Sequence, residues 1–257
     1  MRQGGVNWLF ERCALDELRL AGAGSGTAAA YNCHNMRLQL SAALFLSFVS
    51  ALPAFAGGKD DDAASGRAVI REMNLARQNP ALYATFVQEL RGQMSGNVLV
   101  LPGHTRIRTK EGTAAVDEAI RFLRNAHSLP PLALSRGMSR AAADHCADQA
   151  DGGFGHEGRD RSHAGERIAR YGNFSGGWAE NISYGKSTAR AVVIALIIDD
   201  GLPARKHRTN IFNPSYGYAG AAFGRHARFG TMCSMDFAGG YAERGESAAD
   251  TLVARNF

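Results

Sequence analysis

The sequence predicts an α+β fold, and three observations support this. Apolar residues recur with helical spacing from residue 67 to about 150, short alternating segments typical of strands come late in the chain, and no internal repeat is present. Helices first and antiparallel strands last are typical of α+β proteins. The chain has 257 residues, of which 45% are hydrophobic and 21% charged, and this suits one domain with additional segments.

The helices are predicted from apolar periodicity and from residues that favour helix ends. The apolar stripe Val69–Ala76 predicts a helix that Asn79 and Pro80 should end, and Pro80 suits the first turn of the next helix. Ser135 and Thr188 are expected to cap later helices. Further helices are predicted over residues 113–127, 136–150, 166–171 and 189–199.

The strands are predicted from short alternating apolar runs between turn residues. They cover residues 179–184, 218–223 and 231–237. The glycine-rich segments 92–112 and 151–165 are expected to be loops, the first with at most a short strand.

The segment 36–56, MRLQLSAALFLSFVSALPAFA, has the features of a secretory signal peptide. It has a basic start, a short apolar run and an A-x-A site, so we expect cleavage after Ala56 and a secreted or periplasmic protein. An uncleaved anchor helix is the alternative, but the run is short for a bilayer and Pro53 interrupts it. Residues 1–35 show no targeting pattern and are expected to be an over-long gene prediction upstream of Met36.

The remaining chain divides by composition. Residues 57–66 are expected to be a flexible leader, residues 67–242 one domain, and residues 243–257 a polar C-terminal tail. The net charge of +5 is scattered and forms no concentrated basic stripe, so we expect no nucleic-acid partner. A cell-surface or membrane component remains a candidate partner.

Two cysteines, Cys146 and Cys233, remain after removal of the first 56 residues. An even pair in an exported protein suggests one disulfide, which would contribute about 4 kcal/mol by closing a long loop. Two buried free thiols are the alternative.

Familiar catalytic motifs are missing from the sequence. The segment YGKST before a helix suggests a phosphate-binding loop, but Glu180 stands where that motif needs glycine. No G-x-S-x-G sequence occurs, and HEGRD is not a zinc-protease motif because Asp160 replaces the second histidine.

What remains is a set of separated polar residues in apolar or glycine-rich surroundings, namely His156, Glu180, Asp199, Asp200 and His207. Two histidines and one or two carboxylates can hold a divalent metal such as zinc, or can form a pair that transfers protons. Each residue taken alone can equally be structural. Two acids at a helix C-terminus are unfavourable unless a partner such as Arg205, His207 or a metal compensates them.

Six segments occur in the order found in the CAP superfamily of cysteine-rich secretory, antigen 5 and pathogenesis-related proteins. The chain resembles the bacterial extracellular members of this family over residues 67–241. The segments are MNLARQNPALY, LPPLALSRGMSRAAADHCADQ, GFGHEG, AENISYG, IIDDGLPARKHRTNIFNPSYGYAGAAFG and GTMCSMDFAGGY.

The resemblance implies an α-β-α sandwich, with a small antiparallel sheet between helical layers and a cleft that carries two histidines and two acids. By motif, GFGHEG supplies His156, AENI supplies Glu180 and KHRTNIF supplies His207. Asp199 fits the second acid best, and Asp200 is the alternative. His156 and His207 are the candidate metal ligands.

Several details of the site follow from its neighbours. Arg208 is expected to lie at the rim or to brace the acids. The chain departs from the family pattern at Ala179 and Lys206, where glycine is usual. A lysine beside His207 would disfavour a second positive charge and could lower metal affinity.

Three functions stay open at this point. The first is an exported binding module whose cleft takes a divalent metal or a small amphipathic ligand such as a lipid. The second is a metal-assisted or His/Glu-dependent hydrolase of peptide or cell-wall material, whose weakness is that Ser183 should face away from Glu180. The third is a structural or interaction module without catalysis.

Overall fold

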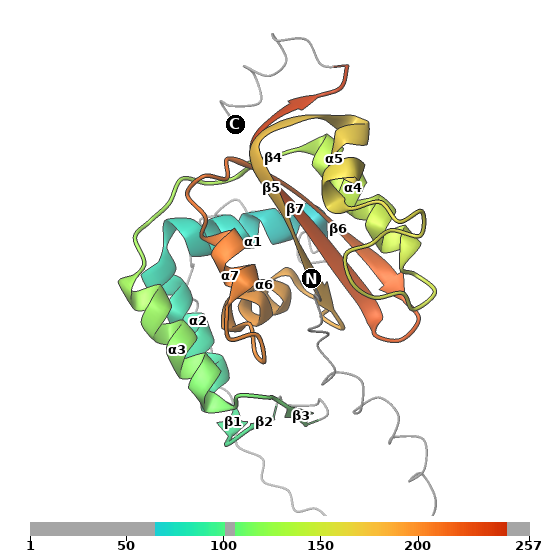
Figure 1. The fold of residues 1–257 in the computed structure, drawn as a ribbon. Helices are drawn as coiled ribbons and strands as arrows, with labels where there is room; N and C mark the ends of the chain where they lie inside the picture. The colour runs from blue at the N-terminus through green and yellow to red at the C-terminus, as the bar shows by residue number, and fades with distance from the viewer. Residues whose placement is uncertain (1–64, 101–105, 246–257) are drawn as a thin grey trace, which may run out of the picture. The chain divides into compact units, whose positions relative to one another are not determined.

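The computed structural model describes residues 65–100 and 106–245, in which a four-stranded sheet separates two groups of helices (Figure 1). The α-β-α arrangement expected from the sequence is confirmed. The predicted upstream segment 1–35, the signal peptide 36–56 with its cleavage site, nearly all of the leader 57–66 and most of the tail 243–257 lie outside the described residues.

The helices begin and end near the predicted residues, because their caps are encoded locally. Ser135 Oγ accepts a hydrogen bond from the Met138 amide, and Thr188 Oγ1 accepts one from the Ala191 amide. The helices are α1 (Gly66–Gln78), α2 (Pro80–Gly92), α3 (Thr113–Asn125), α4 (Arg136–Asp148), α5 (Ala164–Tyr171), α6 (Ala189–Ile198) and α7 (Lys206–Ile211). Helix α7 was not predicted, because its six residues show too little periodicity.

The main sheet has the strand order β4-β6-β7-β5. Its strands are β4 (Ala133–Leu134), β5 (Gly172–Tyr184), β6 (Tyr218–His226) and β7 (Gly230–Glu243). Strands β5, β7 and β6 pair antiparallel, and the two-residue β4 adds a parallel edge. A second small sheet, β1 (Met94–Ser95), β2 (Val98–Leu99) and β3 (Ile107–Arg108), lies in the segment expected to be mostly loop.

Strands β5 and β7 are longer than predicted. The first half of β5 is rich in glycine and carries a bulge between Ser175 and Trp178, which hides its alternation. At its end, β7 includes Glu243, whose carboxylate accepts hydrogen bonds from Ser135 Oγ (2.7 Å) and the Gly137 amide (2.8 Å). Glu243 therefore belongs to the fold and not to a detached tail.

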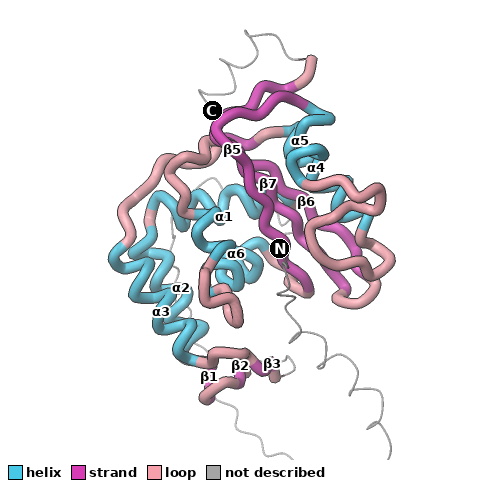
Figure 2. The backbone as a smooth tube through the Cα atoms, viewed as in Figure 1, coloured by secondary structure: helices cyan, strands magenta, loops and turns pink. Residues whose placement is uncertain are grey.

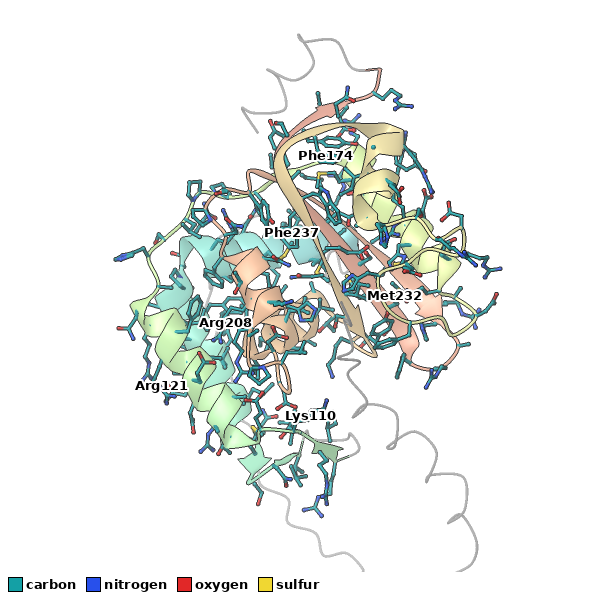
Figure 3. The ribbon with its side chains drawn as sticks, in the orientation of Figure 1. Lys110, Arg121, Phe174, Arg208, Met232 and Phe237 are labelled. Atoms are coloured by element: carbon teal, nitrogen blue, oxygen red, sulfur yellow. The ribbon has the colours of Figure 1, made fainter. Side chains whose placement is uncertain are left out.

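The two faces of the sheet are covered by different helices. Helices α1 and α6 pack on one face, and α4 and α5 pack on the other (Figure 2). Alternation along β7 sends Met235 and Phe237 into the larger apolar core, whereas Met232 packs near α4 on the opposite face (Figure 3).

Alternation also explains why the proposed disulfide is wrong. Cys146 and Cys233 are both free and buried. Cys146 projects from α4 and packs against Met232, whereas Cys233, the next residue of β7, belongs to the core on the other face. The sheet itself separates the two sulfur atoms.

Among the described residues, no helix combines the length and the apolar character that crossing a bilayer requires.

Candidate functional site

Glu180 lies on β5, the edge strand, where its neighbour across the ladder is Asp236 of β7. Its side chain points toward α4 and α5, and the next residue, Asn181, points to the opposite face. Two successive residues of one edge strand therefore reach both sides of the sheet.

The Glu180 carboxylate and His156 form the first of two pairs. His156 Nδ1 donates to Glu180 Oε1 at 2.7 Å, so the second ring nitrogen, Nε2, is left without the proton when the ring is neutral. The Glu180 side chain is 2% exposed and that of His156 is 56% exposed. A buried acid thus fixes the orientation of a ring that faces solvent.

Arg167 of α5 forms hydrogen bonds to both members of this pair. Its fully buried guanidinium donates to Glu180 Oε2 at 2.6 Å, to the Ser162 carbonyl at 2.6 Å and to the His156 carbonyl at 3.2 Å. Ser234 Oγ also approaches Glu180 Oε2, at 3.3 Å. Arg167 therefore binds both the acid and the backbone of the loop that carries the histidine.

The charge of Glu180 is maintained despite its burial. Burial alone would raise the pKa of Glu180, but the hydrogen bond from His156 and the neighbouring His145 and Arg167 lower that pKa overall. The acid is therefore ionised at neutral pH, as an orienting partner of His156 must be.

A second layer of hydrogen bonds fixes the loop just before His156. The Gly155 carbonyl accepts from Gln149 Nε2 at 2.6 Å and from His145 Nε2 at 3.0 Å. Tyr184 donates to Gln149 Oε1 at 2.6 Å and accepts from the Gly155 amide at 3.1 Å, and burial raises the pKa of Tyr184 to about 12. This loop is thus held by side chains of α4 and β5.

Asp236 lies behind Glu180 and is fully buried, with no hydrogen-bond partner for either carboxylate oxygen. Burial and the nearby charge of Glu180 raise the pKa of Asp236 well above its usual range, although Arg167 opposes this. Arg167 therefore balances one ionised carboxylate, Glu180, while Asp236 is neutral.

The second pair consists of His207 and Asp199. His207 Nδ1 donates to Asp199 Oδ1 at 2.7 Å, and the His207 amide donates to Asp199 Oδ2 at 3.0 Å. Asp199 is the C-cap of α6 in a left-handed conformation, φ 54°, which aspartate tolerates better than most residues. Arg205 NH1 donates to the Asp199 carbonyl at 2.8 Å, which offsets the negative end of the helix.

Asp200 and Arg208 have other partners. Asp200 accepts from the Lys110 amide (2.7 Å) and the Glu111 amide (2.8 Å), so it fixes the loop before α3 and does not replace Asp199 beside His207. Both expectations for Arg208 are wrong, because it is only 3% exposed and so does not lie at the rim, and it does not brace the two aspartates. Arg208 (labelled in Figure 3) donates to Glu118 at 2.6 Å and lies over the Phe122 ring, because α7 packs toward α3.

The four candidate residues therefore form two His–carboxylate pairs, linked through β5. Asn181 Nδ2 donates to the His207 carbonyl at 3.0 Å, and Asn210 Nδ2 donates to Asn181 Oδ1 at 2.8 Å. Within residues 65–100 and 106–245, no group of three His, Cys, Asp or Glu side chains could hold a metal ion. The donors that fit a cation chemically are the Nε2 atoms of His156 and His207, one from each pair.

Sequence reasoning missed His145, Gln149, Arg167 and Asp236. Arg167 sits in a short polar helix and resembles a surface residue, since only tertiary packing buries it. A signal for Asp236 was present, because it is the one acid in the apolar run Met232–Ala238. A lone acid in a central strand needs a reason to be there.

Part of the chain matches the sequence model of a known protein family. Residues 115–237 match the sequence model described as CAP, the cysteine-rich secretory protein family. No curated protein is significantly similar to the chain in sequence.

Solved structures of low similarity include three bacterial proteins. An extracellular protein with an SCP domain from Bacillus anthracis is 23% identical with a TM-score of 0.36, and the match covers 47% of this chain and 37% of that chain. An outer surface protein from Borrelia burgdorferi is 16% identical with a TM-score of 0.35, and the match covers 43% of this chain and 78% of that chain. A cysteine-rich secretory protein from Staphylococcus aureus is 13% identical with a TM-score of 0.32, and the match covers 49% of this chain and 37% of that chain. The chain thus spans little more than a third of the Bacillus and Staphylococcus proteins.

Proposed function

Because residues 115–237 match the CAP family model, we propose that the chain is an exported binding protein in which His156 and His207 take up a divalent cation such as zinc. One observation carries the proposal. Each histidine donates from Nδ1 to a buried carboxylate at 2.7 Å, which leaves Nε2 as a lone-pair donor. Metal-binding histidines commonly use a carboxylate in this way to fix the ring and raise its basicity.

The donor set limits the affinity. Structural zinc sites use four protein ligands and catalytic sites three. Two imidazoles would leave the remaining positions to water or to a bound ligand, so we expect weak and exchangeable binding. A small amphipathic ligand or a lipid remains an alternative occupant, as does a cell-surface or membrane component.

Zinc titration by calorimetry tests the proposal. The wild type is compared with His156→Ala/His207→Ala, and with His127→Ala as a matched control, since His127 is exposed and belongs to neither pair. We expect binding that the double variant loses and the control retains. Equal binding by all three proteins, or no binding by the wild type, would reject the cation site.

A second candidate function is hydrolysis of peptide or cell-wall material with His156 as general base. The observation that favours it is the His156–Glu180 pair, in which a buried acid orients an exposed ring, as in catalytic dyads. Ser183 follows Asn181 on the face opposite Glu180, so water is the nucleophile in this proposal. Turnover of a cell-wall preparation that Glu180→Gln abolishes and His127→Ala preserves would support it.

A further inference from the structure

Four partly exposed rings, those of Trp178, His156, Phe154 and Tyr184, lie along one face of β5. Trp178 and Phe154 are 42% and 39% exposed, and His156 lies between them in its contact with Glu180. Trp178, Glu180 and Tyr184 share this face because they are separated by even numbers of residues. We call Trp178, His156, Phe154 and Tyr184 the aromatic row.

The strand is shaped to present Trp178. The bulge in β5 contains Gly176 and Gly177, with φ of 70° and 82°, conformations that favour glycine. The indole lies directly over Gly165 of α5, where an added Cβ would stand 2.7 Å from the ring. One side of the indole is thus supported by the helix, while two fifths of the residue remains accessible.

The other end of the aromatic row is equally supported. Phe154 stacks on Tyr184 with ring centroids 4.7 Å apart and planes 19° from parallel. Tyr184 is itself fixed by its hydrogen bonds to Gln149 and Gly155. Rings that are already fixed lose little conformational entropy when a ligand stacks on them.

The charges around the aromatic row identify the kind of ligand. Exposed residues of both signs interrupt the rings, and several neutralise one another, as in the ion pairs Arg159–Asp151 (2.8 Å) and Arg170–Asp160 (2.6 Å). Exposed charged residues of the loop lie among these rings, an arrangement that suits a polar ligand better than lipid tails. The mixed charge of the loop 151–163 likewise does not complement a polyanion or an anionic membrane.

We propose that the aromatic row binds a neutral oligosaccharide chain. Sugar rings have apolar C–H faces that stack on the electron-rich faces of aromatic rings, and their hydroxyl groups bond to the polar side chains between them. From Trp178 to Tyr184 the strand rises about 20 Å, a length that takes several sugar residues. The site does not depend on the cation proposed above, although His156 lies within it.

Tryptophan fluorescence provides a direct measurement. The chain has two tryptophans, Trp8 and Trp178, so Trp8→Phe leaves Trp178 as the reporter. The probe is the β-1,4-linked hexamer of N-acetylglucosamine, which is neutral and long enough to reach both ends of the aromatic row. We expect saturable binding that moves the emission to shorter wavelength, because stacking removes water from the indole.

Variants then test the two ends separately by calorimetry. Trp178→Ala and Phe154→Ala should each weaken binding of the hexamer about fivefold or more. Leu82→Ala is the matched control, since Leu82 is a comparably exposed apolar residue on α2. Urea unfolding of each variant verifies that it folds, and Trp178→Phe should recover part of the affinity.

Several outcomes would overturn the proposal. They are a wild type that does not bind the hexamer, variants that bind it as the wild type does, and phosphatidylglycerol vesicles whose binding depends on the same two rings. Zinc titration of Trp178→Ala separates the two sites. Loss of hexamer binding with unchanged zinc binding would support the aromatic row, whatever the wild type's affinity for zinc.

Discussion

The two faces of the main sheet are built from alternate residues of the same strands, yet they differ in chemistry. The side chains of Met235 and Phe237 pack into an apolar core covered by α1 and α6. Ser234 and Asp236, their neighbours in β7, face α4 and α5, where Glu180 lies beneath the exposed ring of His156. The strands β5 and β7 thus send buried acids, Glu180 and Asp236, only to the face covered by α4 and α5.

This difference indicates what the buried charge is for. An ion pair such as Arg167–Glu180 contributes little net stability, because desolvation offsets much of the attraction. An apolar pair of similar size would often stabilise a core equally well. The ion pair does what an apolar pair cannot, which is to orient the His156 ring through a hydrogen bond.

The largest effect is expected from breaking the ion pair on the polar face. Arg167→Met leaves Glu180 buried without its cation and should lower the free energy of unfolding by about 3–5 kcal/mol at pH 7. Urea unfolding measures this.

The matched control for that variant removes both charges. Arg167→Met/Glu180→Met should recover much of the lost stability while abolishing the orientation of His156. A loss below about 1 kcal/mol in the single variant would show that the polar face does not depend on the ion pair.

The apolar face offers the contrasting variant. Met235→Ala should lower the free energy of unfolding by about 2–4 kcal/mol through lost contacts and a cavity. The loss should be the same at pH 5 and pH 8, because no ionisable group is removed. A marked pH dependence would contradict the separation between the two faces.

The same contrast explains what the sequence could predict. Helix ends followed from local chemistry, such as the proline at Pro80 and the hydroxyl groups of Ser135 and Thr188. Alternation correctly placed Ser183 away from Glu180. Candidate residues of the site came from six segments in family order and not from periodicity.

Other features depend on packing that no local pattern contains. Whether Arg167 is buried is decided by the loop and the strand that close over it, and the first half of β5 is obscured by its bulge. The partner of Arg208 is Glu118, 90 residues away along the chain. The alternation of side chains along β7 can be read from the sequence, and it places Cys233 on the face opposite Met232. That Cys146 lies on the same face as Met232 could be known only from the fold.

A smaller, pH-dependent effect is expected at Asp236. Its pKa in the folded state is raised, so the folded protein holds this proton more tightly than the unfolded chain does. The stability from the neutral acid is therefore complete below the unfolded pKa and is lost as pH rises toward the folded pKa. Asp236→Asn keeps the shape without the ionisation.

The measurement is the urea midpoint of wild type and Asp236→Asn across the pH range. We expect similar midpoints near pH 3 and a higher midpoint for the variant near pH 8. A variant less stable than the wild type at pH 8 would mean that Asp236 is ionised in the fold and has a compensating partner.

The smallest effect is expected from a reductant, which should leave the thermal stability unchanged. Cys146 and Cys233 lie on opposite faces of the sheet, and burial raises the pKa of the Cys146 thiol to about 11, so it is a poor nucleophile. In a chain with Cys13→Ser and Cys33→Ser, the thermal midpoint should be the same with and without dithiothreitol. Thiol titration should find both groups only after unfolding. A midpoint that falls on reduction would mean that the two sulfur atoms meet, which the alternation of β7 does not allow.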